Sequence, residues 1–309
     1  TFRRVPIVML PQAPLQPLNL PWLAASGVSV AILRLDLIDP LISGNKWFKL
    51  SHHLVAARKT GADGVISLGG AHSNHLHALA AAGQRFGFST VGLLRGHPVE
   101  TPTVLDLQAF GMALHWLGYA GYRARHDADF WTPWRERYPQ LFPIPEGGGG
   151  REGALGCAEI VRQARDQRAD IGWDDYDGWW LACGTGTTLA GLVLAESRPR
   201  KVYGAMAVPT GHGVAENVTA IVGADAHARY ELLDASRGGF GKVDASLLAF
   251  IETSESQSGV PFEPLYTGKA LLALQQTVEA GRFANGTRLV FVHTGGLQGK
   301  RASGALKRY

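Results

Sequence analysis

Short apolar runs rich in β-branched and aromatic residues alternate along the chain with longer stretches whose apolar positions recur at helical spacing. The runs are typical of strands buried on both faces, and the longer stretches of amphipathic helices. We expect strands over residues 64–68, 90–94, 178–182, 202–207 and 288–293. We expect helices over residues 49–59, 74–85, 152–167, 187–196, 213–222, 245–258 and 269–279. The alternation predicts an α/β fold with mostly parallel strands.

Two segments interrupt this alternation. The proline-rich opening, residues 5–21, predicts an extended strap over the surface. Four consecutive glycines at 147–150 predict a loop, because glycine inside an element has a large entropic cost. A plain linker and a functional hinge explain this loop equally well. We place a domain crossing near it, with residues 1–48 and 159–309 forming a large domain and residues 49–158 inserted as a smaller one.

Composition excludes several classes of protein. The net charge of +4 is modest and no block of Lys or Arg marks a nucleic-acid surface. No apolar stretch is long enough to span a membrane. The two cysteines, Cys157 and Cys183, do not make a disulfide framework. We therefore expect a cytoplasmic protein that binds neither nucleic acid nor a membrane, and whose mild positive charge suits an anionic ligand.

The first segment whose residues are suited to catalysis surrounds Lys46. This lysine follows Gly44 and Asn45 and precedes a predicted helix, which predicts a tight turn with a projecting amine. A lysine whose pKa is lowered by its pocket can form a Schiff base with pyridoxal phosphate. A single lysine is a weak signal, since exposed lysines are common, and it needs partners elsewhere.

The second segment lies where a predicted strand leads into a helix. Ser73 and Asn74 open this helix and can act simply as its cap. Hydroxyl and N–H groups at a helix start also bind carboxylates. Three histidines stand close together in this segment, His72, His75 and His77, but the last two point to different helix faces and no acidic residue is nearby in the sequence. We therefore expect no metal site.

The third segment, residues 183–191, joins a predicted strand to an apolar helix and is rich in Gly and Thr. Such a connection cradles phosphate with N–H groups and hydroxyls. A dinucleotide fingerprint fails, because Leu189 stands at the third glycine position and residues 201–207 lack the acidic residue. A Walker loop fails because no Lys follows the glycines. The sequence therefore predicts a site for a single phosphate.

Two further loops, residues 265–269 and 292–299, place polar groups at a helix start or strand end, where open α/β sheets bind ligands. Each one can be ordinary turn chemistry. Five such loops in one chain favour a composite binding site.

The order of these motifs resembles the 1-aminocyclopropane-1-carboxylate deaminase and D-cysteine desulfhydrase family of fold-type II, tryptophan-synthase-β-like, pyridoxal-phosphate enzymes. The resemblance runs from about residue 21 to residue 299. It rests on Gly-Asn-Lys, Gly-Gly-x-x-Ser-Asn, Ile-Pro-Glu-Gly-Gly, Gly-Thr-Gly-Thr-Thr, Tyr-Thr-Gly-Lys and His-Thr-Gly-Gly in family order. It implies two open twisted, mostly parallel sheets flanked by helices, a cofactor between the domains, and a homodimer.

The resemblance also implies roles for single residues. Lys46 would be the Schiff-base lysine and proton shuttle, and Asn74 would bind the phenolic oxygen of the cofactor. The substrate carboxylate would be received by Ser73, Asn74 and His75, and Tyr266 would lie beside the substrate. The cofactor phosphate would be held by Lys49 and by the loop residues Gly184, Thr185, Gly186, Thr187 and Thr188. The pyridine nitrogen would be contacted by Thr267 and Thr294.

Three positions depart from the family pattern. The deaminases carry Gln where His75 stands and Glu where Thr267 stands, and family members commonly carry Tyr where Phe240 stands. A phenyl ring cannot transfer a proton. A Thr hydroxyl carries no charge that would keep the pyridine nitrogen protonated, so the electron sink is weaker than with Glu.

These features lead us to expect α,β-elimination on a small amino acid, of the D-cysteine desulfhydrase type, with release of a keto acid and ammonia. Lys46, Ser73 and Tyr266 are the expected catalytic residues. One alternative is ring-opening deamination of aminocyclopropane carboxylate. Another is a non-catalytic pyridoxal-phosphate-binding protein that kept Lys46 and lost its acid at Phe240.

Overall fold

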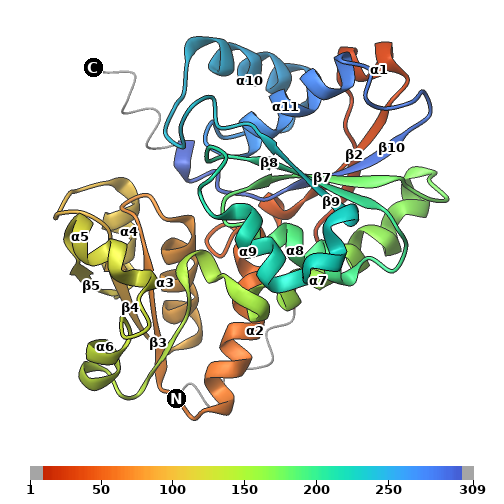
Figure 1. The fold of residues 1–309 in the computed structure, drawn as a ribbon. Coiled ribbons are helices and arrows are strands. Elements are labelled where there is room, and N and C mark those ends of the chain that lie inside the picture. The colour runs from red at the N-terminus through yellow and green to blue at the C-terminus, as the bar shows by residue number, and fades with distance from the viewer. Residues whose placement is uncertain (1–9, 301–309) are drawn as a thin grey trace.

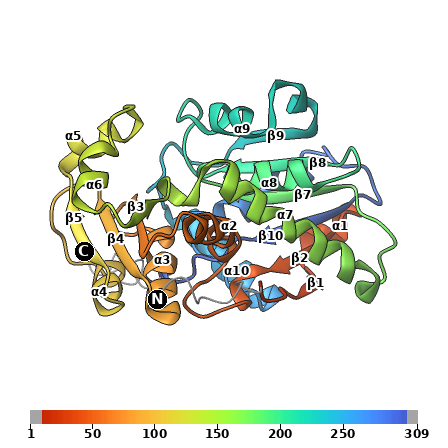
Figure 2. The same ribbon diagram turned by 90° about the horizontal axis from the view of Figure 1, so that it is seen from below.

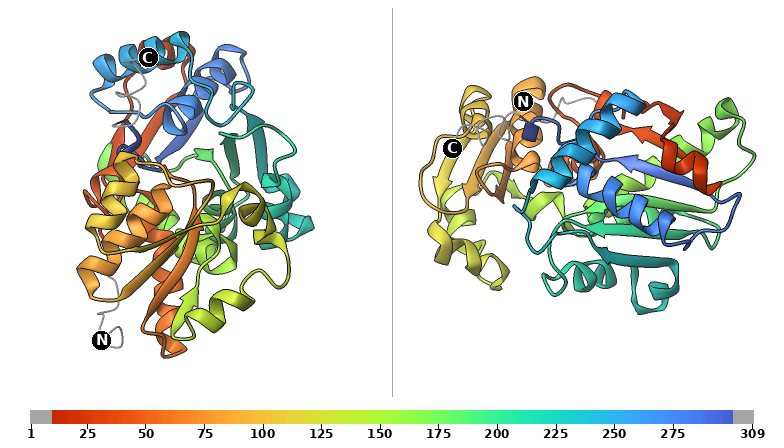
Figure 3. Two further views of the ribbon diagram at one scale, coloured as in Figure 1. Left: turned by 90° about the vertical axis from the view of Figure 1, so that its left-hand side faces the viewer. Right: turned by 90° about the horizontal axis from the view of Figure 1, so that it is seen from above.

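The computed structural model describes residues 10–300, which form two sheets. The larger sheet has six strands in the order β1-β2-β10-β7-β8-β9, and the smaller has four in the order β5-β4-β3-β6. The sheets lie side by side, each with helices on its faces (Figures 1, 2 and 3). The expected α/β architecture of two mostly parallel sheets is confirmed.

The strands of the larger sheet are parallel except for the antiparallel pair β1–β2. Side chains of β7 alternate between its faces, so that Trp179 and Leu181 join one core and Trp180 and Ala182 the other. Burial on both faces explains why this strand is apolar throughout. The strands are β1 (Leu15–Pro17), β2 (Ser29–Arg34), β7 (Gly178–Cys183), β8 (Lys201–Met206), β9 (Tyr230–Asp234) and β10 (Arg288–His293).

Two sets of helices cover this sheet. One core is closed by α7 (Gly150–Gln167), α8 (Thr187–Ala195) and α9 (Val214–Val222). The other is closed by α1 (Pro21–Ser26), α10 (Ala245–Ser258) and α11 (Thr267–Glu279). The short 3₁₀ helices of this half are η2 (Leu35–Leu37), η5 (Arg168–Ile171) and η6 (Ala224–Arg229).

The smaller sheet is entirely parallel. Its strands are β3 (Gly64–Gly69), β4 (Ser89–Leu94), β5 (Ala113–Trp116) and β6 (Leu141–Pro143). One face packs on α2 (Asn45–Lys59), α3 (Asn74–Phe86) and α4 (Pro102–Ala109), the other on α5 (Gly118–Arg123) and α6 (Thr132–Arg137). The 3₁₀ helices here are η3 (Ala124–His126) and η4 (Glu146–Gly148). Helix α2 also packs on α7, so it lies between the sheets (Figure 2).

The structure corrects two local expectations. Helix α2 begins at Asn45, four residues earlier than expected, because Gly44 takes a positive φ of 68° and starts it. Lys46 therefore lies in the first helical turn, and not on a turn before the helix. The glycine run is divided, since Gly148 ends η4 and Gly150 already begins α7.

The predicted division into domains stays a prediction. Its crossings at residues 48 and 158 fall within α2 and α7, which pack on each other. The expected strap of residues 5–21 contains β1 and the start of α1, and its first five residues lie outside the described part of the chain.

Candidate active site

The start of α2 joins three of the predicted loops. The main-chain N–H of Asn45 donates to the carbonyl of Thr294 at 3.1 Å, and the Asn45 amide donates to the Thr188 hydroxyl at 2.8 Å. A Cβ on Gly44 would lie 2.0 Å from the Thr294 carbonyl oxygen, so only glycine fits this contact. The loops after β10 and β7 therefore meet around Lys46.

Two lysine amines at the start of α2 share one partner. Lys46 Nζ and Lys49 Nζ both donate to the carbonyl of Gly147, at 3.3 and 3.4 Å. Burial, and next the charge of Lys49, hold the pKa of Lys46 well below its ordinary value. Burial also lowers the pKa of Lys49. The Lys46 amine is thus more readily unprotonated and nucleophilic than a surface lysine.

The start of α3 presents donors close to these lysines, because a Cβ on Gly148 would lie 3.3 Å from both the His75 ring and Lys49 Cβ. Ser73 caps the helix, its hydroxyl oxygen accepting the N–H of Leu76 at 3.1 Å. The hydroxyl proton stays available to a second acceptor. The Asn74 amide oxygen accepts from Gln298 Nε2 at 2.8 Å, which leaves the amide N–H₂ group to face Gly296. Gln298 lies in a motif we recognised, but its orienting contact with Asn74 was not expected from the sequence.

Hydrogen bonds determine the tautomer of His75, which is buried. The Ser67 hydroxyl donates its one proton to the carbonyl of Ile144 at 2.8 Å. His75 Nε2, 2.8 Å from the same hydroxyl oxygen, must therefore carry a proton and donate. Within the described residues His75 Nδ1 has no hydrogen-bond partner. Burial, then the charge of Lys46, holds the His75 pKa well below its ordinary value, so the imidazole is a neutral acceptor.

The loop between β7 and α8 has the geometry of an anion cradle. Gly186 begins α8 with a positive φ of 80°, and a Cβ there would lie 2.5 Å from Val218. The first N–H groups of a helix have no intrahelical partner and carry its positive end. The hydroxyls of Thr185 and Thr187 are 2.9 Å apart at this start. A Cβ on Gly147, whose carbonyl accepts from Lys49, would lie 3.4 Å from Thr185. These groups can hold one phosphate.

Tyr266 lies against this loop. A Cβ on Gly184 would be 3.1 Å from the Tyr266 ring, and the Tyr266 hydroxyl makes no hydrogen bond to any described residue. Burial, then the charges of Glu263 and Glu146, raises the pKa of Tyr266. The hydroxyl therefore stays protonated and is a donor.

Thr267 has local partners. Its hydroxyl accepts the N–H of Glu263 at 3.0 Å and lies 3.2 Å from that residue's carboxylate. The expected contact with a pyridine nitrogen stays a prediction, and the hydroxyl would first have to leave Glu263. Thr294, at the end of β10, is buried, and its hydroxyl makes no hydrogen bond within the described part of the chain.

Glu263 was not expected from the sequence. It is 1% exposed, and its carboxylate accepts the N–H groups of Leu265, Tyr266 and Thr267 at 2.8, 2.8 and 2.6 Å. Burial raises its pKa, against the lowering effect of these hydrogen bonds. It fixes the start of α11, and an acidic residue just before a predicted helix was the available signal.

The neighbourhood of His77 corrects one premise of the sequence argument. Asp106 of α4 lies 3.1 Å from His77 Nε2, although no acidic residue is near it in the sequence. Among residues 10–300 no group of three His, Cys, Asp or Glu side chains is placed to hold a metal ion. Both cysteines are free buried thiols. In the same part of the chain no helix is both long and apolar enough to cross a membrane.

Known proteins similar to this chain share almost its whole length. It is 29% identical over 290 residues to a putative 1-aminocyclopropane-1-carboxylate deaminase of Pyrococcus horikoshii, covering 88% of this chain and 86% of that one. It is 26% identical to a bifunctional D-cysteine desulfhydrase/1-aminocyclopropane-1-carboxylate deaminase, mitochondrial, of Arabidopsis thaliana, covering 93% and 76%. A solved structure of an ACC deaminase homologue superposes with a TM-score of 0.82 at 27% identity, covering 97% and 96%.

The residues present fit pyridoxal phosphate. The loops that meet around the start of α2 bring a lysine amine of lowered pKa and a helix start with two threonine hydroxyls. The start of α3 adds an Asn74 amide whose N–H₂ group has no hydrogen-bond acceptor among residues 10–300. The sequence model of the family described as "Pyridoxal-phosphate dependent enzyme" matches residues 10–295. The chain therefore belongs to the pyridoxal-phosphate-dependent enzymes.

Proposed function

We propose that this enzyme catalyses α,β-elimination on a small amino acid, releasing a keto acid and ammonia, with D-cysteine as the first substrate to test. The similarity to a bifunctional D-cysteine desulfhydrase supports this choice. The observation that carries it is the segment 263–267. Thr267 stands where deaminases carry Glu, and the carboxylate of Glu263 is occupied by three main-chain N–H groups. No carboxylate of this segment is free to bind the cofactor's ring nitrogen.

The bound cofactor supplies an electron sink. Lys46 binds it covalently and moves the proton of the substrate's Cα. Lys49 and residues Gly184 to Thr188 hold the phosphate, and the Asn74 amide donates to the phenolic oxygen. Without a charged partner for the ring nitrogen the sink is weaker, which suits a good leaving group such as a thiolate.

The start of α3 holds the substrate. The Ser73 hydroxyl and the N–H groups at this helix end donate to the substrate carboxylate. His75 contributes its main-chain N–H, because its imidazole Nδ1 is an acceptor and would repel a carboxylate. Tyr266 donates from the other side of the cleft, beside the leaving group.

Side-by-side turnover of D-cysteine, β-chloro-D-alanine and aminocyclopropane carboxylate by the purified holoenzyme tests this function. We expect faster keto-acid release from D-cysteine and β-chloro-D-alanine. Faster turnover of aminocyclopropane carboxylate would make the enzyme a deaminase of that substrate instead. Keto-acid release from any amino acid removes the non-catalytic alternative.

The oligomeric state and the cellular location of the enzyme belong to the same proposal. We infer a homodimer from the resemblance of its motifs to this family, and a cytoplasmic location from a composition that lacks a disulfide framework. Light scattering coupled to gel filtration measures the oligomeric state, and a monomer at micromolar concentration would contradict the dimer.

A further inference from the structure

The connection between β9 and α10 places an apolar ring beside Tyr266. The Phe240 ring is 40% exposed, and its centroid lies 5.3 Å from that of Tyr266 in an edge-to-face arrangement. Tyr266 in turn lies against Gly184 of the phosphate loop. Phe240 therefore forms the solvent side of an aromatic pair at the candidate site.

A buried lysine holds this connection in place. Lys269 is 2% exposed, and its amine donates to the carbonyls of Ser236, Gly239 and Phe240 at 3.0, 3.0 and 2.8 Å. These three bonds use all the donors of an ammonium group. Tyr266 is the residue directly before α11 and Lys269 lies in the first turn of that helix, so one helix start positions both Tyr266 and the group that holds Phe240 against it.

Further contacts keep the connection in a backbone conformation that is otherwise unfavourable. Arg237 has a φ of 58°, the one positive value among described residues other than glycine. Its side chain donates to Asp244 at 2.6 Å and to Ser246 at 3.0 Å, and the N–H of Ser236 donates to Asp234 at 2.9 Å. The position of Phe240 is thus determined without a ligand.

We propose that the Phe240 ring, held against Tyr266, forms an apolar wall that selects amino acids with an alkyl group on the leaving sulfur, S-alkyl cysteines, over those with a free thiol. The inference rests on the proposed elimination. The Cα proton passes to Lys46, and the Cβ–S bond breaks with its electron pair on sulfur, which takes up a proton to give the alkanethiol. Hydrolysis of the remaining unsaturated amino acid by one water gives the keto acid and ammonia. Phe240 has no hydroxyl for a thiol to bind, whereas an alkyl group can cover its exposed ring.

The wall predicts a graded preference along the series D-cysteine, S-methyl-, S-ethyl- and S-propyl-D-cysteine, measured on the holoenzyme. Each added methylene buries apolar surface worth about a fourfold gain in kcat/KM. We expect the gain to fall below about twofold per methylene in Phe240→Ser. Tyr119→Ser removes another exposed aromatic ring, which lies in α5 on the smaller sheet and contacts His97, and should leave the gradient unchanged.

Lys269 is tested as a positioning residue by Lys269→Met. We expect this variant to lose the gradient as Phe240→Ser does, while it keeps the cofactor absorption band. Lys269→Met removes a buried group that makes three hydrogen bonds, so this variant can fail to fold. In that case Phe240→Ser alone tests the proposal.

Binding gives a second readout that needs no turnover. Titration of the cofactor absorption with each amino acid yields Kd, and the same gradient is expected there. A wild-type enzyme that turns over D-cysteine but shows no gradient in kcat/KM or Kd would overturn the wall and leave the elimination standing. A gradient in Kd without release of any keto acid would overturn the elimination and leave the wall standing. A gradient that survives Phe240→Ser would also overturn the wall.

Discussion

Lys46 is the residue on which the site depends. Its amine has the strongly lowered pKa that covalent cofactor binding needs, but Lys49 shares the same carbonyl partner and Lys269 is also buried. The positions of these amines therefore do not by themselves show which one binds the cofactor. Chemical labelling does.

We predict that Lys46→Ala abolishes the absorption band of the lysine-bound cofactor. Borohydride reduction of wild-type enzyme followed by peptide mapping should find the cofactor on Lys46. Lys49→Ala, the matched control, should keep the label on Lys46 but bind the cofactor more weakly, because one positive charge near the phosphate is lost. A label on Lys49 or Lys269 would show the assignment to be wrong.

Ser73 has two roles that one substitution removes together. Ser73→Ala should lower kcat/KM by one to two decades, since a hydrogen bond to a charged group contributes about 1.5–3 kcal/mol. It should also reduce the free energy of unfolding by about 1 kcal/mol through loss of the α3 cap. Assays of both quantities separate the roles.

The control for this prediction is Ser73→Asp. An aspartate caps the helix, so stability should stay near wild type, but its charge repels the substrate carboxylate and activity should fall further. Unchanged kcat/KM in Ser73→Ala would leave Ser73 as a helix cap only.

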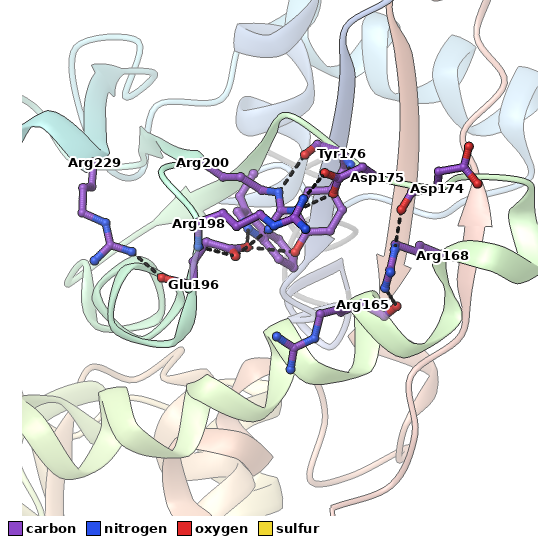
Figure 4. A network of polar contacts seen from close by, with 10 residues as sticks. Arg165, Arg168, Asp174, Asp175, Tyr176, Glu196, Arg198, Arg200 and Arg229 are labelled. Atoms are coloured by element: carbon purple, nitrogen blue, oxygen red, sulfur yellow. Dashed lines mark hydrogen bonds and ion pairs between the residues drawn. The ribbon is translucent and has the colours of Figure 1, made fainter.

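At the scale of elements, the end of α8 is tied to the sheet by Glu196, which follows its last turn. The buried carboxylate accepts from Tyr176 at 2.8 Å, Trp179 at 3.1 Å and Arg200 at 2.6 Å (Figure 4). These partners stand before β7, in β7 and before β8. Because the start of α8 is the proposed phosphate site, this contact helps to orient that site from the opposite end of the helix.

We predict that Glu196→Gln lowers the free energy of unfolding by about 1.5–3 kcal/mol, since hydrogen bonds to a charged group are lost in a buried place. Urea denaturation measures it. Asp166→Asn breaks an exposed ion pair with Arg162 and should cost no more than about 0.5 kcal/mol. Equal effects of the two substitutions would mean that Glu196 contributes no more than a surface pair.

At the scale of the whole molecule, three buried histidines link stability to pH. Burial is the largest cause of the lowered pKa of His53, His75 and His293. Below the ordinary histidine pKa of about 6.5 the unfolded chain binds protons that the folded protein does not. Stability is therefore lost as pH falls below this value, by up to about 1.4 kcal/mol per pH unit for each histidine. Glu263 has a raised pKa, so its contribution to stability has the opposite pH dependence and is lost as pH rises.

We predict that the free energy of unfolding of the purified enzyme falls between about pH 6.5 and pH 5. His75→Gln should make this fall shallower, because its side chain does not titrate. His52→Gln replaces an exposed histidine and should leave the slope unchanged. A flat profile in wild type would show that the buried histidines are not kept neutral.

The pattern of apolar positions and the order of the motifs were sufficient to predict the architecture and the family, and the roles of the site residues stay predictions. Strands such as β7 and β10 were predicted because burial on both faces makes β7 apolar throughout and β10 apolar from Leu289 to Val292. Motif order along the chain was enough to identify the family and to nominate Lys46. By contrast, β5 and β9 have largely half-buried or exposed positions, so no apolar run marks them. The apolar run of β2 was readable and was overlooked.

Only the tertiary structure decided how the side chains of the site are oriented. The bond from Gln298 to Asn74 spans 224 positions, and the one from Lys269 to Phe240 spans 29. The tautomer of His75 depends on the carbonyl of Ile144, which reaches Ser67 only through the packing beside β3. Local periodicity reports which residues are buried, but a hydrogen bond depends on where two separate segments meet. For that reason the roles of Gln298 and Lys269 emerged only from the folded chain, whereas Glu263 bonds its own neighbours and had a signal in the sequence.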